Sequence, residues 1–194
     1  MLLRFVVQNF TSFKDAVEFN TFPSSKSHSH EHHKNVCGHA VSLRMSAIYG
    51  ANGAGKSNLL GAIRSLKFLI QSESLRNVEF LDDVYFRFAS ECATQPSGLA
   101  IEFYRNGNVF YYHVEFNKES VVMEGLLLSK KNKDVEIFSR ENGKISINRD
   151  LAKDINAQFV DALDRLVRPD MLLLSFMVYQ QIRAQSREET YMFR

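Results

Sequence analysis

The chain has 194 residues, of which 45% are hydrophobic, and its formal net charge is +2. This length allows one large domain or two small ones. So small a charge neither demands nor excludes a nucleic-acid partner, whose binding usually shows as a basic stripe. Its two cysteines form no Cys-x-x-Cys motif, its N-terminus lacks a signal-peptide layout, and no apolar run is long enough to span a bilayer. We therefore expect a cytoplasmic protein with free thiols and no membrane contact.

Two strands are predicted at the N-terminus. Residues 2–9 read as a strand because Leu3, Phe5 and Val7 alternate onto one face. A short turn follows, and residues 16–20 read as a second strand, which we expect to pair with the first.

The next segment, residues 23–39, is polar, rich in serine and holds five of the six histidines. Two interpretations are open for it. A zinc site would draw on the side chains that can ligate a metal, namely His28, His30, His32, His33, Cys37 and His39. Structural zinc sites usually pair ligands from two separated elements, whereas this run is dense, so a solvated loop is the interpretation that we prefer.

The central motif is a phosphate-binding loop. Residues 50–57 read Gly-Ala-Asn-Gly-Ala-Gly-Lys-Ser and fit Gly-x-x-x-x-Gly-Lys-[Ser/Thr] at every fixed position. In this pattern the glycines let backbone N–H groups turn toward a phosphate, Lys56 reaches the β- and γ-phosphates, and the hydroxyl of Ser57 ligates Mg²⁺. The predicted nucleotide-binding residues of the loop are Gly50, Ala51, Asn52, Gly53, Ala54, Gly55, Lys56, Ser57 and Asn58.

The flanks of this loop have the context that the motif requires. Residues 43–49 are largely apolar and are predicted to form a buried strand, and residues 59–70 repeat leucine and isoleucine at helical spacing. A strand before the loop and a helix after it favour a genuine phosphate site over the alternative, a glycine-rich turn that happens to carry a lysine.

An antiparallel meander is predicted after this helix. Asn106-Gly107 and Asn142-Gly143 are dipeptides favoured in type I′ turns between adjacent strands. Strands are expected at residues 84–88, 99–104, 109–116, 121–128, 135–139 and 144–147. Two helices follow, at residues 151–167 and from 171 to about 185, with Asp170 as the N-cap of the second.

Two stretches carry a family resemblance. The first is Asn9-Phe10-Thr11-Ser12-Phe13 between two strands, with the phosphate-binding loop about forty residues further on. The second is residues 100–112, which read Ala-Ile-Glu-Phe-Tyr-Arg-Asn-Gly-Asn-Val-Phe-Tyr-Tyr and follow the helix after that loop. Together they resemble the N-terminal lobe of the ABC-type ATPase heads of RecF, SMC and Rad50 proteins. The resemblance is strongest to the AAA15 group of bacterial ATPases, many of which belong to abortive-infection and other anti-phage systems, retron- and Septu-like ones included.

The resemblance implies an α/β P-loop NTPase fold, in which a mixed sheet carries an antiparallel β-subdomain and flanking helices. We expect a nucleotide-binding core at residues 1–72, the β-subdomain at residues 78–148 and a helical segment at residues 150–194. The resemblance also places Asn9, Phe10 and Ser12 near the adenine and ribose of ATP. An ordinary hairpin turn with two core phenylalanines is the open alternative for that turn.

The function implied by the resemblance is ATP hydrolysis with Mg²⁺, by heads that pair with a second copy of the ATPase and switch an anti-phage complex with a nuclease or toxin effector. Three alternatives stay open: a RecF- or Rad50-like ATPase of DNA repair or DNA processing, a nucleotide-sensing scaffold without hydrolysis, and a small-molecule kinase. DNA or RNA as a partner is left open as well. The kinase is the least favoured, because kinases of that kind place a substrate lid where this chain has antiparallel strands.

Two further elements of such ATPases are not found in the sequence. A Walker B strand has four or more apolar residues before Asp-Glu, and its nearest match, Phe-Leu-Asp-Asp at residues 80–83, is too short; an LSGGQ-like signature does not occur either. We therefore expect residues 1–194 to be the N-terminal lobe of a longer protein. Such a lobe would supply Lys56 as its catalytic residue and bind ATP, but would not hydrolyse it alone.

Overall fold

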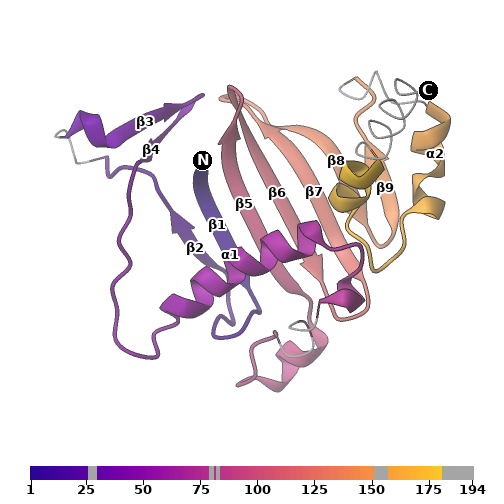
Figure 1. The fold of residues 1–194 in the computed structure, drawn as a ribbon, viewed down its shortest axis with the longest axis horizontal. Helices are drawn as coiled ribbons and strands as arrows, with labels where there is room; N and C mark the ends of the chain where they lie inside the picture. Colours follow the sequence, from indigo (N-terminus) through magenta and orange to yellow (C-terminus); the bar gives the residue numbers. More distant parts are fainter. Residues whose placement is uncertain (26–29, 79–80, 82–83, 151–156, 181–194) are drawn as a thin grey trace, which may run out of the picture.

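One seven-stranded sheet organises the fold (Figure 1). The computed structural model describes residues 1–25, 30–78, 81, 84–150 and 157–180. The sheet has the order β2-β1-β5-β6-β7-β8-β9, and every pairing between these described strands is antiparallel. Its strands are β1 (Leu2–Gln8), β2 (Val17–Asn20), β5 (Ser97–Arg105), β6 (Asn108–Phe116), β7 (Val121–Ser129), β8 (Val135–Glu141) and β9 (Lys144–Ile147).

The predicted meander is confirmed from β5 to β9. Both Asn-Gly turns have the backbone that a type I′ turn demands, with φ of 49° and 84° at Asn106 and Gly107, and 48° and 85° at Asn142 and Gly143. The N-terminal hairpin is confirmed as well, since β1 pairs with β2. Because β1 also pairs with β5, strands from the first two predicted segments share one sheet; their division into domains stays a prediction.

The predicted helix after the phosphate-binding loop is confirmed as α1 (Lys56–Gln71), which lies across one face of the sheet (Figure 1). Its inward side chains, such as Leu59, Leu66 and Leu69, are buried against the sheet. Phe5 and Val7 point from β1 into the same core, on the face that the alternation predicts. The core therefore lies between α1 and the sheet.

The C-terminal helices differ from their predicted starts. The first, α2, is described from Ala157 to Leu166, and its predicted beginning at residues 151–156 lies outside the described residues. The second begins at residue 173, and the expected part at 181–185 again lies outside. The prediction that Asp170 caps this helix was wrong, because the N–H groups of Leu173 and Leu174 donate to Glu124 on β7 instead.

Two predicted strands do not form. Residues 84–88 are irregular, and their backbone binds the turn after β1: Thr11 N–H donates to Val84 O, and Phe86 N–H donates to Asn9 Oδ1. Residues 45–50 are also irregular, with Met45 81% and Tyr49 90% exposed. The parallel pairing expected of a mixed sheet is therefore not seen among the described strands.

A small hairpin replaces part of the loop predicted at residues 23–39. It consists of β3 (Lys34–Cys37) and β4 (Ala40–Leu43), preceded by a 3-10 helix at Glu31–His33. The thiol of Cys37 is buried against Leu3 and Val109, so this polar segment is anchored to the main sheet by an apolar contact.

Candidate nucleotide-binding site

The phosphate-binding loop lies between β4 and α1, on a connection that runs outside the main sheet (Figure 1). Gly53 and Gly55 have φ of 81° and 84°, in the left-handed region that favours glycine. A side chain at Gly55 would also crowd its neighbours, because a Cβ there would lie 3.0 Å from Ser12 Oγ. Glycine is thus required at position 55 both by the turn and by the close approach of the turn after β1.

The first turn of α1 opens into a hollow of about 290 Å³ that is lined by residues 52–58. The N-cap, Gly55, has no side chain to accept hydrogen bonds from the first N–H groups of the helix. Those N–H groups and the helix dipole make a site for an anion. Among the residues described, the lining of this hollow carries a single charge, the ammonium of Lys56.

Lys56 folds back over the loop. Its Nζ donates to the carbonyl oxygens of Gly50 and Ala51, with both distances 2.7 Å. This position holds the ammonium beside the hollow, and no carboxylate among the described residues pairs with it, so a phosphate could replace the two carbonyls as its acceptor. Ser57 is exposed at the same helix end, where its hydroxyl can reach a metal ion bound to such a phosphate.

Of the three residues predicted near adenine and ribose, Ser12 adjoins the loop. Its Oγ accepts a hydrogen bond from Nδ2 of Asn58 at 2.8 Å. This contact joins the turn after β1 to α1, although 46 residues separate the two side chains.

Asn9 and Phe10 are buried instead. Asn9 Nδ2 donates to the carbonyls of Cys92 and Gln95, and its Oδ1 accepts from Phe86 N–H. Phe10 lies in the core, as the alternative interpretation of a turn with core phenylalanines expects. The nucleotide contact proposed for these two residues stays a prediction.

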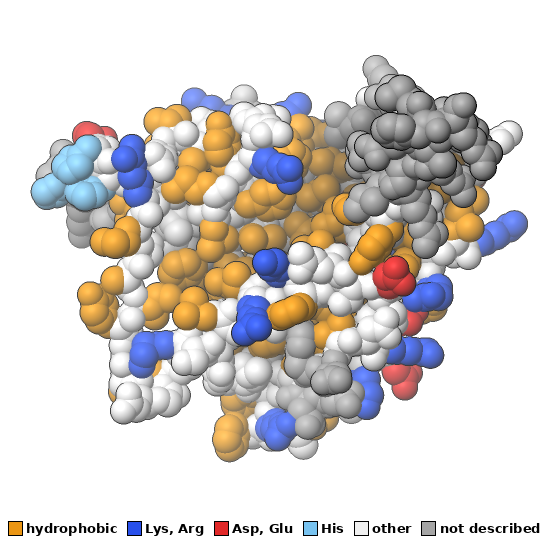
Figure 2. All heavy atoms as spheres, in the orientation of Figure 1, with side chains coloured by type: hydrophobic (Ala, Val, Ile, Leu, Met, Phe, Trp, Pro, Cys, Tyr) orange, Lys and Arg blue, Asp and Glu red, His pale blue; other side chains and the backbone are white. Residues whose placement is uncertain are grey.

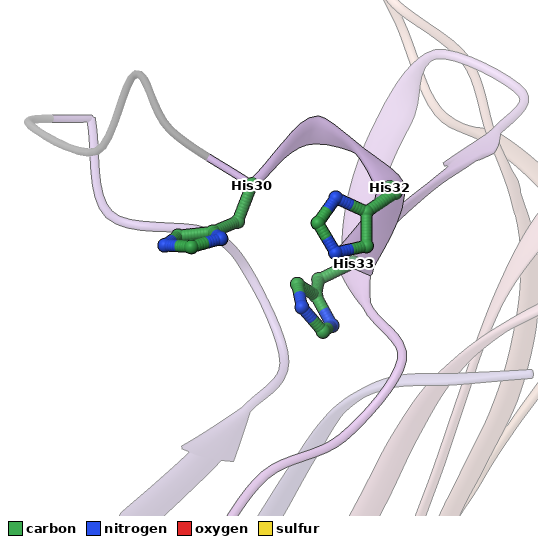
Figure 3. Close-up of side chains that lie close together, drawn as sticks. All are labelled: His30, His32 and His33. Carbon is green, nitrogen blue, oxygen red and sulfur yellow. The ribbon is translucent and has the colours of Figure 1, made fainter.

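The structure also gathers three residues of the histidine-rich run. Ring nitrogens of His30, His32 and His33 all lie within 4.8 Å of one another, and all three side chains are exposed (Figure 3). His39 is in the turn at the opposite end of the β3–β4 hairpin, and His28 lies outside the described residues. The sequence shows these histidines close together, but we preferred a solvated loop to a zinc site because the histidines are so densely spaced.

Two other features bear on the function. The nearest Walker B match, at residues 80–83, lies mostly outside the described residues. Within the described chain, no helix has the length and apolar character needed to cross a membrane.

Sequence comparison agrees with the loop geometry. No curated protein matches the chain. A family model described as "AAA domain, putative AbiEii toxin, Type IV TA system" matches residues 45–185 and so includes the phosphate-binding loop, α1 and the meander. The match covers most of the chain, and the chain therefore belongs to this AAA_21 family of AAA domains, which are nucleotide-binding P-loop ATPase domains.

Proposed function

We propose that this chain binds ATP with Mg²⁺ on residues 50–58. Lys56 contacts the β- and γ-phosphates, and Ser57 ligates the metal. The observation that carries the proposal is the opening at the start of α1, where uncapped N–H groups and one lysine face a hollow lined by otherwise neutral residues. Ser12 lies beside this hollow, where its Oγ accepts a hydrogen bond from Asn58, one of the residues that line it.

Residues 1–194 bind this nucleotide without turning it over at ordinary rates. Hydrolysis needs a group that orients the attacking water and groups that balance charge in the transition state. The described lining of the hollow offers an ammonium, a hydroxyl and amides, but no carboxylate. In the ABC- and SMC-like cycle that the resemblance implies, a second copy of the ATPase completes the site, and ATP binding and hydrolysis engage and release the two heads.

The biological setting follows from resemblance and family description. We place this ATPase in the cytoplasm, switching an anti-phage complex with a nuclease or toxin effector; the family description names a toxin of a toxin–antitoxin system. A nucleotide-sensing scaffold is the second candidate, favoured by the same lining without a carboxylate. The two differ in the intact protein, since only the switch loses function when its hydrolysis is blocked.

The binding step can be tested with two lysines of the same helix. Lys56→Ala should weaken Mg²⁺-ATP binding by about 10- to 100-fold, because charged hydrogen bonds are worth about 1.5–3 kcal/mol. Lys67→Ala removes an exposed lysine three turns further along α1 and should leave affinity unchanged. Isothermal titration calorimetry measures both, and circular dichroism checks that each variant is folded.

Equal affinity in the wild type and the folded Lys56→Ala variant would overturn the proposed site. The hydrolysis claim has its own test, the release of phosphate by purified residues 1–194. Enzymes typically turn over about 1–1,000 times per second, and we expect a rate far below that range. Turnover at ordinary ATPase rates, lost in Lys56→Ala, would overturn the claim that residues 1–194 do not hydrolyse ATP alone.

A further inference from the structure

The three clustered histidines occupy a defined turn rather than an unstructured run. His30 is the N-cap of the 3-10 helix Glu31–His33, with φ of 60° and ψ of 46°. Histidine is among the few non-glycine residues enriched in this left-handed region. The N–H of His33 donates to His30 O at 2.9 Å and closes the turn.

This backbone explains why the rings converge. A 3-10 helix has three residues per turn, so positions 30 and 33 lie on the same side, and position 32 is next to them. The ring centroids of His32 and His33 are 4.1 Å apart, and the ring of His30 lies 5.7 Å from that of His33. In Figure 3 the three rings surround one small volume beside the helix.

We propose that His30, His32 and His33 bind one divalent transition-metal ion, such as Zn²⁺, through one ring nitrogen each. Zinc–nitrogen bonds of about 2.0–2.1 Å in a tetrahedron put ligand nitrogens about 3.4 Å apart. The present separations of up to 4.8 Å close to that value by rotation of exposed side chains. Three imidazoles select zinc, copper, nickel or cobalt over magnesium, and leave a coordination position for water.

The surrounding contacts hold this turn in place. Lys34 Nζ donates to Glu31 Oε1 at 2.6 Å, so the lysine that directly follows the cluster is paired with a carboxylate of the same turn. Arg44 N–H donates to His33 O at 2.9 Å. Because Arg44 follows β4 and begins the connection to the phosphate-binding loop, a bound ion would stabilise the turn to which the start of that connection is hydrogen-bonded.

The test uses the 194-residue chain without an affinity tag, titrated with ZnCl₂ by calorimetry and with Co²⁺ by visible absorption. We expect saturable binding of one ion per chain. Removing a group that only orients a ligand costs about 10- to 100-fold in metal affinity, so His30→Gln, His32→Gln and His33→Gln should each cost at least that much. His39→Gln, at the far end of the hairpin, is the matched control and should bind like the wild type.

The proposal would be overturned by no saturable binding by the wild type, by undiminished binding in the folded His32→Gln/His33→Gln double variant, or by an equal loss in His39→Gln. A loss in His28→Gln with none in His33→Gln would also assign the ion elsewhere. The side chains of the triad are exposed, so their substitution should leave the fold intact. ATP affinity in the same variants should be unchanged, which keeps this test separate from that of the nucleotide site.

Discussion

At the scale of single residues, Glu124 is the side chain that joins the sheet to the C-terminal helices. It is fully buried on β7, where its carboxylate accepts hydrogen bonds from Tyr112 Oη and from the N–H groups of Leu173 and Leu174. Burial raises the pKa of Glu124, and these hydrogen bonds together with the nearby charge of Arg140 offset only part of that effect. The carboxylate thus caps a helix from a strand 49 residues away.

Glu124→Gln should lower the free energy of unfolding by about 2–3 kcal/mol. The amide keeps the shape but replaces one acceptor oxygen with a donor that faces backbone N–H groups, and hydrogen bonds to a charged group contribute about 1.5–3 kcal/mol. Glu141→Gln, at the exposed end of β8, is the control and should change stability by less than about 0.5 kcal/mol. Urea denaturation measures both; a loss no larger in Glu124→Gln than in the control would show that the helix start does not depend on this carboxylate.

The stability deficit of Glu124→Gln should also depend on pH. A raised pKa means that the native chain keeps a proton which the unfolded chain has released above its ordinary pKa of about 4.3. Raising the pH through the interval between the two pKa values therefore removes stability from the wild type but not from the variant. Urea midpoints at pH 5 and pH 7 should show a smaller deficit at pH 7, whereas a deficit that grows with pH would reverse the sign of the shift.

At the scale of elements, the sequence was most informative where local chemistry decides the structure. The Asn-Gly turns and the alternation of β5 to β9 are local signals, and the meander follows them closely. Apolar and polar side chains alternate just as well at residues 84–88, yet this segment forms hydrogen bonds with the turn after β1. Such a long-range contact leaves no pattern in the local sequence. Likewise, the strand β3 was not predicted, because its segment is polar. Only one of its side chains, Cys37, is buried.

The connection at residues 45–50 allows a direct test of a predicted element, because a buried strand was expected at residues 43–49. Tyr49 was expected in a buried strand, but it is 90% exposed. Tyr49→Ala should therefore change the free energy of unfolding by less than about 0.5 kcal/mol, while Leu66→Ala, in the buried face of α1, should cost about 2–5 kcal/mol. Urea denaturation compares the two, and a cost for Tyr49→Ala that approaches that of Leu66→Ala would restore the buried strand.

At the scale of the whole molecule, the apolar core and the candidate nucleotide site are built from different parts of the chain. The sheet and the buried side of α1 provide the core, and hydrophobic side chains extend over the sheet face beside the helix (Figure 2). The phosphate-binding loop is carried on a connection outside that core and is fixed at its far end by α1. The motif and its helix could be predicted from sequence because they are local, whereas the course of the connection depends on its partners in space.

This separation predicts where the folded chain is first cleaved and how nucleotide changes it. Exposed connections with few packed side chains open locally far more easily than core strands, so chymotrypsin should cut after Tyr49 before it cuts within β5–β7. If opening requires release of the nucleotide, Mg²⁺-ATP at 100 times its dissociation constant should slow this cut by about 100-fold, since bound ligand stabilises the closed form by about 2.7 kcal/mol. At the same ATP concentration, Lys56→Ala should be cut at the same place with only about 2- to 11-fold protection, because its affinity is about 10- to 100-fold weaker. Mass spectrometry of the fragments identifies the site, and a first cut in the sheet, or equal protection of the variant, would contradict the assignment of ATP to this loop.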